Sequence, residues 1–460
     1  MNVDDLQWQA DRWGGISPLV VDRLVEYGHL ELVVQAADER GDWFCARAAM
    51  RELCAARDFE RAWAVMKPFA ETGWLPAVSA GADVLIRWGR VEDALALVRP
   101  EGPSWQTAQR CRAYAEILVK AGRADEAFTV LEPHLADGRV LLSLVEMTEG
   151  QGEDERVLEL IVPLAEEARR VQAEGGSSSL WEALDLQAEV LERSGRAEEA
   201  MRILGADVAA RRYGPQNTVE TYAKLLARHG RIEELLQAAH GGHAREALPP
   251  LVRALKDAGR AHEAEAVLRA FIAATDYPGN YQALLMDLLA GQERIDEAVE
   301  LVRPTFADPW NGLLYPAVLM LAEIGLHERA LRLLDECSPE FLDETHWVPS
   351  NRWWLMGETG CCREAIAEIE AMPDLDADER AITIASLLAQ DGRPDEAIKL
   401  LRSHAGLAAA TDLAVLLIRQ NRAAEAIAVI PSVAAQREDA ERRWGTWNGT
   451  EAGSTDGPLL

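Results

Sequence analysis

The chain has 460 residues, 48% of them apolar, which exceeds what one compact core buries and favours several domains or an array of repeats. Its 47 basic and 77 acidic side chains give a formal net charge of −30, which disfavours nucleic acids and anionic membranes as partners. A basic protein, a basic peptide or a cation fits this charge better, although solubility alone also explains it.

The amino terminus lacks the basic start and apolar stretch of a secretory signal, and no apolar run reaches the roughly 20 residues of a membrane span. Residues 1–14 contain Trp8 and Trp13 and are expected to cap the first helical hairpin. None of the six cysteines forms a Cys-x-x-Cys pair, a pattern that predicts reduced thiols in a cytoplasmic protein. They are Cys45, Cys54, Cys111, Cys337, Cys361 and Cys362.

A repeated string dominates the rest of the chain. Ala-Gly-Arg-Ala-Asp-Glu-Ala at 121–127 has relatives such as Ser-Gly-Arg-Ala-Glu-Glu-Ala at 194–200 and Asp-Gly-Arg-Pro-Asp-Glu-Ala at 391–397. The last residue of each string serves as its anchor, and from Ala62 to Ala426 the spacing averages about 33 residues. The anchors are Val33, Ala62, Ala94, Ala127, Val157, Ala200, Leu235, Ala264, Ala298, Ala330, Ala365, Ala397 and Ala426.

Each string predicts the turn between two helices. Glycine stands five residues before the anchor in ten of the thirteen units and Asn421 in one, and these residues accept the left-handed backbone that ends a helix. Arg57 and Glu293 occupy the same place, so those two turns are expected to be less ideal. Acidic residues come next in the string, and they are favourable in the first turn of the following helix because they oppose the positive end of its dipole. The small anchor lets the two helices approach closely. An apolar residue four after the anchor extends the buried stripe.

This pattern resembles the tetratricopeptide repeat and covers residues 15 to about 440. The resemblance implies an all-α fold, an elongated α-α superhelix of about 12–13 antiparallel helix hairpins whose first helices line a concave groove. The array is expected at 15–444, with a long loop near 172–180 and a disordered tail at 445–460. One departure is proline six past the anchor, which predicts short or bent second helices. It occurs at Pro68, Pro100, Pro133, Pro163 and Pro304.

The pentatricopeptide repeat is the nearest competing family, since it carries a similar string at a similar length. That family reads single-stranded RNA and is usually basic, so the net charge of −30 argues against this alternative.

No phosphate-binding loop and no hydrolase or metalloprotease motif occurs, so the sequence predicts no catalytic residue, cofactor or metal. The two histidines of His240-Gly241-Gly242-His243 could coordinate a metal ion, but the segment lacks the third and fourth ligands that a zinc site needs. The adjacent Cys361 and Cys362 could serve in redox chemistry, with two ordinary thiols as the alternative.

Two groups are candidates for contact with a partner. Glu182, Asp185, Glu189 and Glu192 are spaced to lie on one face of a first helix, where they could receive the Lys or Arg side chains of a protein. The alternative is a solvated outer face beside the Gly-Ser loop.

The second group is aromatic, with the composition of an interaction hot spot. It comprises Trp347, Asn351, Arg352, Trp353 and Trp354. Adjacent tryptophans on a helix point about 100° apart, so one buried stripe hardly hides both. Trp353 takes a position that other units fill with a small residue, which makes irregular core packing the alternative.

The sequence therefore predicts a non-catalytic scaffold or regulatory adaptor that binds a protein or peptide. The first alternative is a sensor subunit that holds a small ligand or signalling peptide. An RNA-binding protein, or an enzyme whose active site is assembled from side chains of several repeats, is less favoured.

Overall fold

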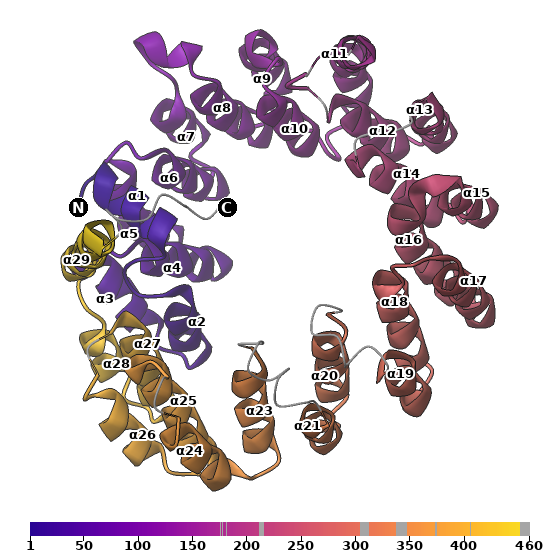
Figure 1. Ribbon diagram of the computed structural model, residues 1–460. Helices are drawn as coiled ribbons and strands as arrows, with labels where there is room; N and C mark the ends of the chain where they lie inside the picture. Colours follow the sequence, from indigo (N-terminus) through magenta and orange to yellow (C-terminus); the bar gives the residue numbers. More distant parts are fainter. Residues whose placement is uncertain are drawn as a thin grey trace. The chain divides into compact units, whose positions relative to one another are not determined.

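The computed structural model describes residues 1–174, 176, 178–180, 182–210, 216–303, 312–336, 347–372, 375–404 and 406–450, without the side chains of 216, 302 and 443–450. Within these ranges the regular structure is helical and contains no strand, which confirms the predicted fold class (Figure 1). None of the helices in the described part of the chain has the length and apolarity to cross a bilayer. The chain forms two compact units, unit 1 (1–123 and 360–460) and unit 2 (124–359).

Unit 1 contains helices from both ends of the chain. From the amino-terminal end come α1 (Val3–Arg12), α2 (Pro18–Glu26), α3 (Leu30–Arg40), α4 (Trp43–Ala55), α5 (Phe59–Ala70), α6 (Leu75–Arg87), α7 (Val91–Val98), the 3-10 turn η1 (Gly102–Gln106) and α8 (Ala108–Lys120). From the other end come α24 (Cys362–Glu370), α25 (Ala377–Gln390), α26 (Pro394–Leu401), α27 (Leu407–Arg419), α28 (Ala423–Val429) and α29 (Val433–Thr450).

Unit 2 is one continuous run of hairpins. It contains α9 (Ala124–Leu131), η2 (Glu132–His134), α10 (Gly138–Met147), α11 (Asp154–Ala173), α12 (Ala183–Arg193), α13 (Ala197–Ala210), α14 (Gln216–Arg228), α15 (Ile232–Ala238), η3 (Ala239–His243), α16 (Ala244–Asp257), α17 (Ala261–Ala274), α18 (Gly279–Ala290), α19 (Ile295–Val302), α20 (Leu314–Glu323), α21 (His327–Asp335) and α23 (Trp347–Glu358).

The hairpins of unit 2 form an arc with two layers. The first helices α10, α12, α14, α16 and α18 line its concave side, here called the inner face, and α11, α13, α15, α17 and α19 form the outer layer (Figure 1). Each first helix contacts the next one along this row. Side chains on exposed positions of the first helices are therefore presented together on one surface.

The turns follow the predicted rule in all thirteen units. The residue five before each anchor has a positive φ, between 57° and 83°. Arg57 and Glu293 adopt the same conformation, at 59° and 63°, so the expectation of less ideal geometry there is wrong. In both turns the next backbone N–H closes the helix, from Asp58 to the Leu53 carbonyl at 2.8 Å and from Arg294 to the Leu289 carbonyl at 3.0 Å. The surrounding repeat evidently imposes the turn even where the residue is unfavourable.

The predicted core is also confirmed. All thirteen anchors are at most 1% exposed, and apolar residues four further on, such as Met66, Ile161 and Leu268, have no exposed surface. The small residues of the first helices, such as Ala82 and Ala188, are buried against them. The core is thus a line of contacts between consecutive helices, as a repeat array requires.

The arginine of the repeated string has a structural role. Arg196, Arg260 and Arg393 each pair with the glutamate three residues later, at 2.7–2.8 Å. Several of these arginines also reach back to the preceding repeat, as Arg231 does to Glu198 at 2.8 Å. The charges that make the string so recognisable therefore tie each turn to its own helix and to its neighbour.

The prolines act less uniformly than predicted. Helices α7 and α9 are short, at eight residues each, and end just before Pro100 and Pro133. Pro68 and Pro163 instead lie inside α5 and α11, and α11 continues to 20 residues, so these two prolines do not shorten the second helix as they do in α7 and α9. Pro304 lies outside the described residues.

In unit 1 the last hairpin of the chain packs on the first. Helix α27 contacts α2, and α28 contacts α3, so the row of first helices runs α25, α27, α2, α4, α6 and α8 (Figure 1). The sequence predicted that residues 1–14 cap the first hairpin. Within unit 1, α27 and α28 contact that hairpin and α1 contacts α4, so this placement of residues 1–14 is corrected.

Polar side chains fix this contact, here called the seam. Gln436, which is 6% exposed, accepts from the Gly15 N–H at 2.9 Å and donates to the Gly15 carbonyl at 3.0 Å. Arg40 donates to the carbonyls of Ile427, Ile430 and Pro431 at 2.6–2.8 Å. The Arg40 bonds satisfy carbonyls at the end of α28, and the Gln436 bonds satisfy the main chain of Gly15 before α2.

Two predicted segments fall partly outside the described residues. The loop near 172–180 follows the long helix α11, and Gly175 and Ser177 within it are not described. Helix α29 includes 445–450, and 451–460 lie outside the described residues, so the disordered tail stays a prediction.

Candidate functional site

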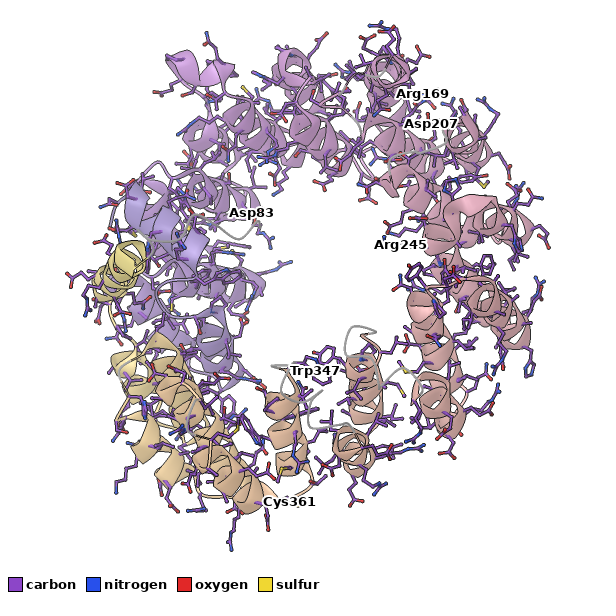
Figure 2. All side chains as sticks on the ribbon, viewed as in Figure 1. Asp83, Arg169, Asp207, Arg245, Trp347 and Cys361 are labelled. Carbon is purple, nitrogen blue, oxygen red and sulfur yellow. The ribbon has the colours of Figure 1, made fainter. Side chains whose placement is uncertain are left out.

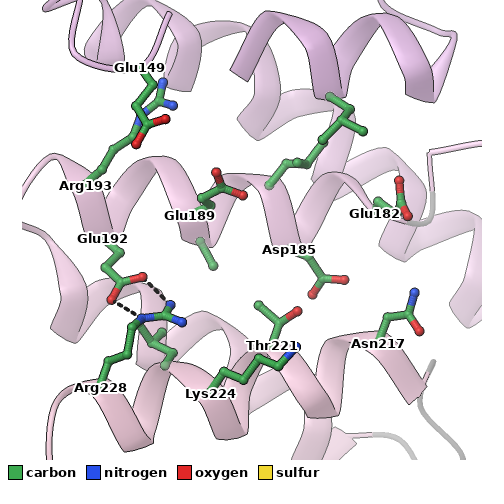
Figure 3. Close-up of a pocket in the computed structure, with 14 residues that line it drawn as sticks. Glu149, Glu182, Asp185, Glu189, Glu192, Arg193, Asn217, Thr221, Lys224 and Arg228 are labelled. Atoms are coloured by element: carbon green, nitrogen blue, oxygen red, sulfur yellow. Dashed lines mark hydrogen bonds and ion pairs between the residues drawn. The ribbon is translucent and has the colours of Figure 1, made fainter. Parts of the chain in front are cut away.

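The acidic stripe of α12 lies on the inner face of unit 2, where it lines a cavity of about 610 Å³ (Figure 3). Helices α10, α12 and α14 build this cavity, and the segment after α10 adds Glu149. The sequence thus predicted one wall of a real concavity. Its lining residues are Leu142, Glu149, Glu182, Asp185, Leu186, Ala188, Glu189, Glu192, Arg193, Asn217, Thr221, Lys224, Leu225 and Arg228.

The cavity contains three basic residues, and all of them are engaged within the protein. Arg193 bonds to Asp154 at 2.8 Å and to the Val145 carbonyl at 2.6 Å, with its side chain 15% exposed. Lys224 pairs with Glu220 at 2.6 Å, one turn earlier on α14. The third base, Arg228, pairs with Glu192, as the dashed lines in Figure 3 mark.

The carboxylate of Glu192 is therefore not available as the sequence suggested. The Nε of Arg228 donates to it at 2.9 Å, and the ring of His229 lies 3.0 Å away. The Arg228 hydrogen bond is the main cause that lowers the pKa of Glu192. The neighbouring helix α14 has already neutralised this end of the stripe.

Three other acidic residues line the cavity without an ion-pair partner among the described residues. Glu149, Glu182 and Glu189 form no ion pair with a residue that the structure describes, and Thr218 donates to Asp185 at 3.4 Å. Desolvation in the concavity raises the pKa of Glu189, and the charges of Glu149 and Glu146 add to this, whereas Arg193 and Arg228 act in the opposite direction. The net shift disfavours the ionised form of Glu189.

The aromatic group is divided between core and surface. Trp353 is 3% exposed, which corrects its assignment to a contact surface and supports the packing alternative. Trp354, the next residue, is 38% exposed and meets His327 edge-on at 6.0 Å. The 100° step between neighbouring helical residues, noted in the sequence, explains the division.

The remaining members of this group belong to the start of α23. Trp347, labelled in Figure 2, packs edge-to-face on Tyr315 of α20, with ring centroids 4.9 Å apart. The side chain of Asn351 donates to the Trp347 carbonyl at 2.8 Å, and Arg352 pairs with Asp335. These polar contacts are internal, so the accessible aromatic surface reduces to Trp354 and part of Trp347.

No family profile matches the chain, and no curated protein sequence matches it. Solved helical-repeat structures do. They include the Naa15/Naa10 complex bound to HypK-THB (13% identity, 84% of this chain and 67% of that one, TM-score 0.36) and the pentatricopeptide repeat protein PPR10 from maize (15%, 94% and 70%, TM-score 0.32). Yeast Tom70 is a third (14%, 78% and 91%, TM-score 0.27). Similarity at this level carries no argument about partners.

The repeat itself is evident in thirteen turns with positive φ and thirteen buried anchors. The chain is a helical-repeat protein whose turns and anchors resemble those of the tetratricopeptide repeat. What distinguishes one such array from another is the set of side chains on its inner face.

The histidine pair at 240 and 243 and the cysteine pair at 361 and 362 were the other motifs noted in the sequence. His240 stacks on Phe271 with centroids 5.1 Å apart. Among the described residues no group of three or more His, Cys, Asp or Glu is arranged to hold a metal. Cys361 is the N-cap of α24 and partly exposed, whereas Cys362 is buried and desolvation raises its pKa, which disfavours a reactive thiolate there.

Unit 1 holds a second cavity, of about 750 Å³, lined by Trp8, Leu407, Pro431 and residues of α29. Two of its polar lining residues, Gln436 and Arg437, are bound to Gly15 and to Asp5, so part of this cavity wall belongs to the seam.

Proposed function

We propose that the inner face of unit 2 binds a basic segment of a partner protein, and that the chain acts as a non-catalytic scaffold or regulatory adaptor. One observation carries the proposal. Glu149, Glu182 and Glu189 face a single cavity without ion-pair partners among the described residues, while every basic side chain around it is engaged. A cytoplasmic location is proposed with it and rests on the sequence alone.

Several physical features support a peptide as the occupant. A volume of about 610 Å³ suits one or two long side chains. A Lys or Arg side chain there would gain a carboxylate partner while its methylene stem packs on Leu142 and Leu186. Exposed charges of this kind steer and select a partner more than they tighten its complex.

Hexalysine, labelled with a fluorophore, tests the proposal by fluorescence anisotropy at physiological salt. A triple variant, Glu149→Lys with Glu182→Lys and Glu189→Lys, should weaken binding by about tenfold or more. The matched control reverses three exposed acids on the outer helices α11 and α15, with Glu159→Lys, Glu166→Lys and Glu233→Lys. Equal weakening by both variants would mean that only the net charge matters and would overturn the proposal.

The variant Glu189→Gln gives a second test, because it should change stability and hexalysine binding in opposite directions. Because burial raises the pKa of Glu189, its ionised form is disfavoured in the folded state, so removing the charge should slightly stabilise the protein at neutral pH. The same variant should weaken hexalysine binding. A residue kept only for structure would not trade stability against binding in this way.

A further inference from the structure

Two helices from the acidic stripe, the inner face of unit 2 becomes basic. Arg245, Arg253 and Lys256 are exposed on α16, and their spacing of eight and three residues places them on one face of the helix. Arg245 is labelled in Figure 2, where it points to the concave side of unit 2. This stretch of Arg245, Arg253 and Lys256 is here called the basic strip.

Arg245 and Arg253 differ from the turn arginines of unit 2 and, like Arg139 of α10 and Arg202 of α13, form no ion pair among the described residues. Those of the turns, such as Arg196, Arg231 and Arg294, each pair with one or more glutamates. Arg169 on α11 likewise pairs with the buried Asp207 of α13 at 3.3 Å (Figure 2). Arg245 and Arg253 make no ion pair or hydrogen bond with any residue that the structure describes. In a chain of net charge −30, two such guanidinium groups on one helix face call for an anionic partner.

The strip has defined borders. On one side, α14 presents the neutral Asn217 and Thr221 together with the already paired Lys224 and Arg228. On the other side stands Asp287 of α18, whose pKa is raised by burial and by Glu323 and lowered by Lys256. Among the described residues of α12, α14 and α16, the basic side chains without an ion pair are therefore those of α16, and the inner face changes from acidic to neutral to basic across these three first helices.

We infer that the inner face of unit 2 binds one extended segment of mixed charge, with Lys or Arg at the α12 cavity and Asp or Glu at the basic strip. This rests on the proposed function and adds an ordering to it. Packed helices lie about 8–10 Å apart, so α12 and α16 are separated by roughly 16–20 Å. An extended chain advances about 3.3 Å per residue, so the two charged blocks should be about five or six residues apart.

Two labelled peptides of identical composition test the ordering. The blocked peptide is Lys-Lys-Gly-Ser-Gly-Ser-Gly-Glu-Glu, and the interleaved one is Lys-Glu-Gly-Ser-Gly-Ser-Gly-Lys-Glu. The full-length protein should bind the blocked peptide about five- to tenfold more tightly by anisotropy. Arg253→Glu should abolish this preference, whereas the control Arg202→Glu, an exposed arginine on the outer helix α13, should retain it.

The outcomes separate the two proposals. Equal affinity for both peptides, or equal effects of Arg253→Glu and Arg202→Glu, would overturn the ordering, and hexalysine binding that still depends on Glu189 would leave the proposed function intact. Failure to bind hexalysine would overturn both. A labelled single-stranded RNA that binds the wild type and is lost in Arg253→Glu would also overturn the inference, since the strip would then serve a nucleic acid.

Discussion

In unit 1 the amide of Gln436 and the guanidinium of Arg40 bind main-chain groups across the seam. In unit 2 the carboxylates of Glu182 and Glu189 line the cavity of the inner face without an ion pair, and the guanidinium of Arg253 is exposed. Both units are built from the same hairpin. The difference lies in whether a polar side chain finds its partner inside the protein. Where it does, the side chain specifies the packing of the array, and where it does not, it is available to a ligand.

The largest expected effect separates core from surface within unit 2. Trp353→Ala should lower the free energy of unfolding by about 3–5 kcal/mol, because removing the buried indole ring leaves a cavity. The neighbouring Trp354→Ala should cost less than about 1 kcal/mol. Urea unfolding measures the loss of unfolding free energy in each variant, and native-state hydrogen exchange shows in which unit that loss occurs. A comparable loss in both variants would show that the aromatic group is wrongly divided.

The next effect concerns the seam. Gln436→Ala should cost about 1–3 kcal/mol, because it leaves the N–H and carbonyl of Gly15 without their partner in a buried place. Faster hydrogen exchange should appear in α2 and α27, and the exchange of α12 to α18 should not change. Gln420→Ala, at an exposed position after α27, is the matched control. Unchanged exchange at α2 would mean that the seam does not hold the two chain ends together.

A pH-dependent effect is expected at Glu265 of unit 2. Arg294, and then Arg269, lower the pKa of Glu265 from 4.5 to about 2. Since the folded pKa is lowered, the stabilisation is complete above the unfolded value and is lost as the pH falls from about 4.5 toward 2. Glu265→Gln should remove about 1 kcal/mol at neutral pH and flatten this slope, after allowance for solvent screening. Glu263→Gln, two residues away, should keep the slope.

The smallest effect compares one turn from each unit. Arg57 in unit 1 and Glu293 in unit 2 hold a left-handed backbone that glycine adopts without strain. Arg57→Gly and Glu293→Gly should each raise stability by about 0.5–1 kcal/mol, measured by thermal unfolding. No gain at either site would indicate that the surrounding repeat already relieves the strain.

The sequence could predict whatever recurs with the repeat. The glycine-type turns, the buried anchors and the inward face of α12 all follow from a period of about 33 residues. The seam could not be predicted, because Gln436 and Gly15 are 421 residues apart and share no periodic signal. The pairing of Glu192 with Arg228 was missed for a related reason, since the stripe of one helix says nothing of the side chains on the next.

Hydrogen exchange of the full-length protein with and without hexalysine tests the central claim most directly, because it locates the bound surface without any substitution. Protection should appear in α12 and in the segment 148–153 after α10, and the outer helices and unit 1 should be unaffected. Protection confined to the outer helices, or spread evenly over both units, would contradict the assignment of binding to the inner face of unit 2.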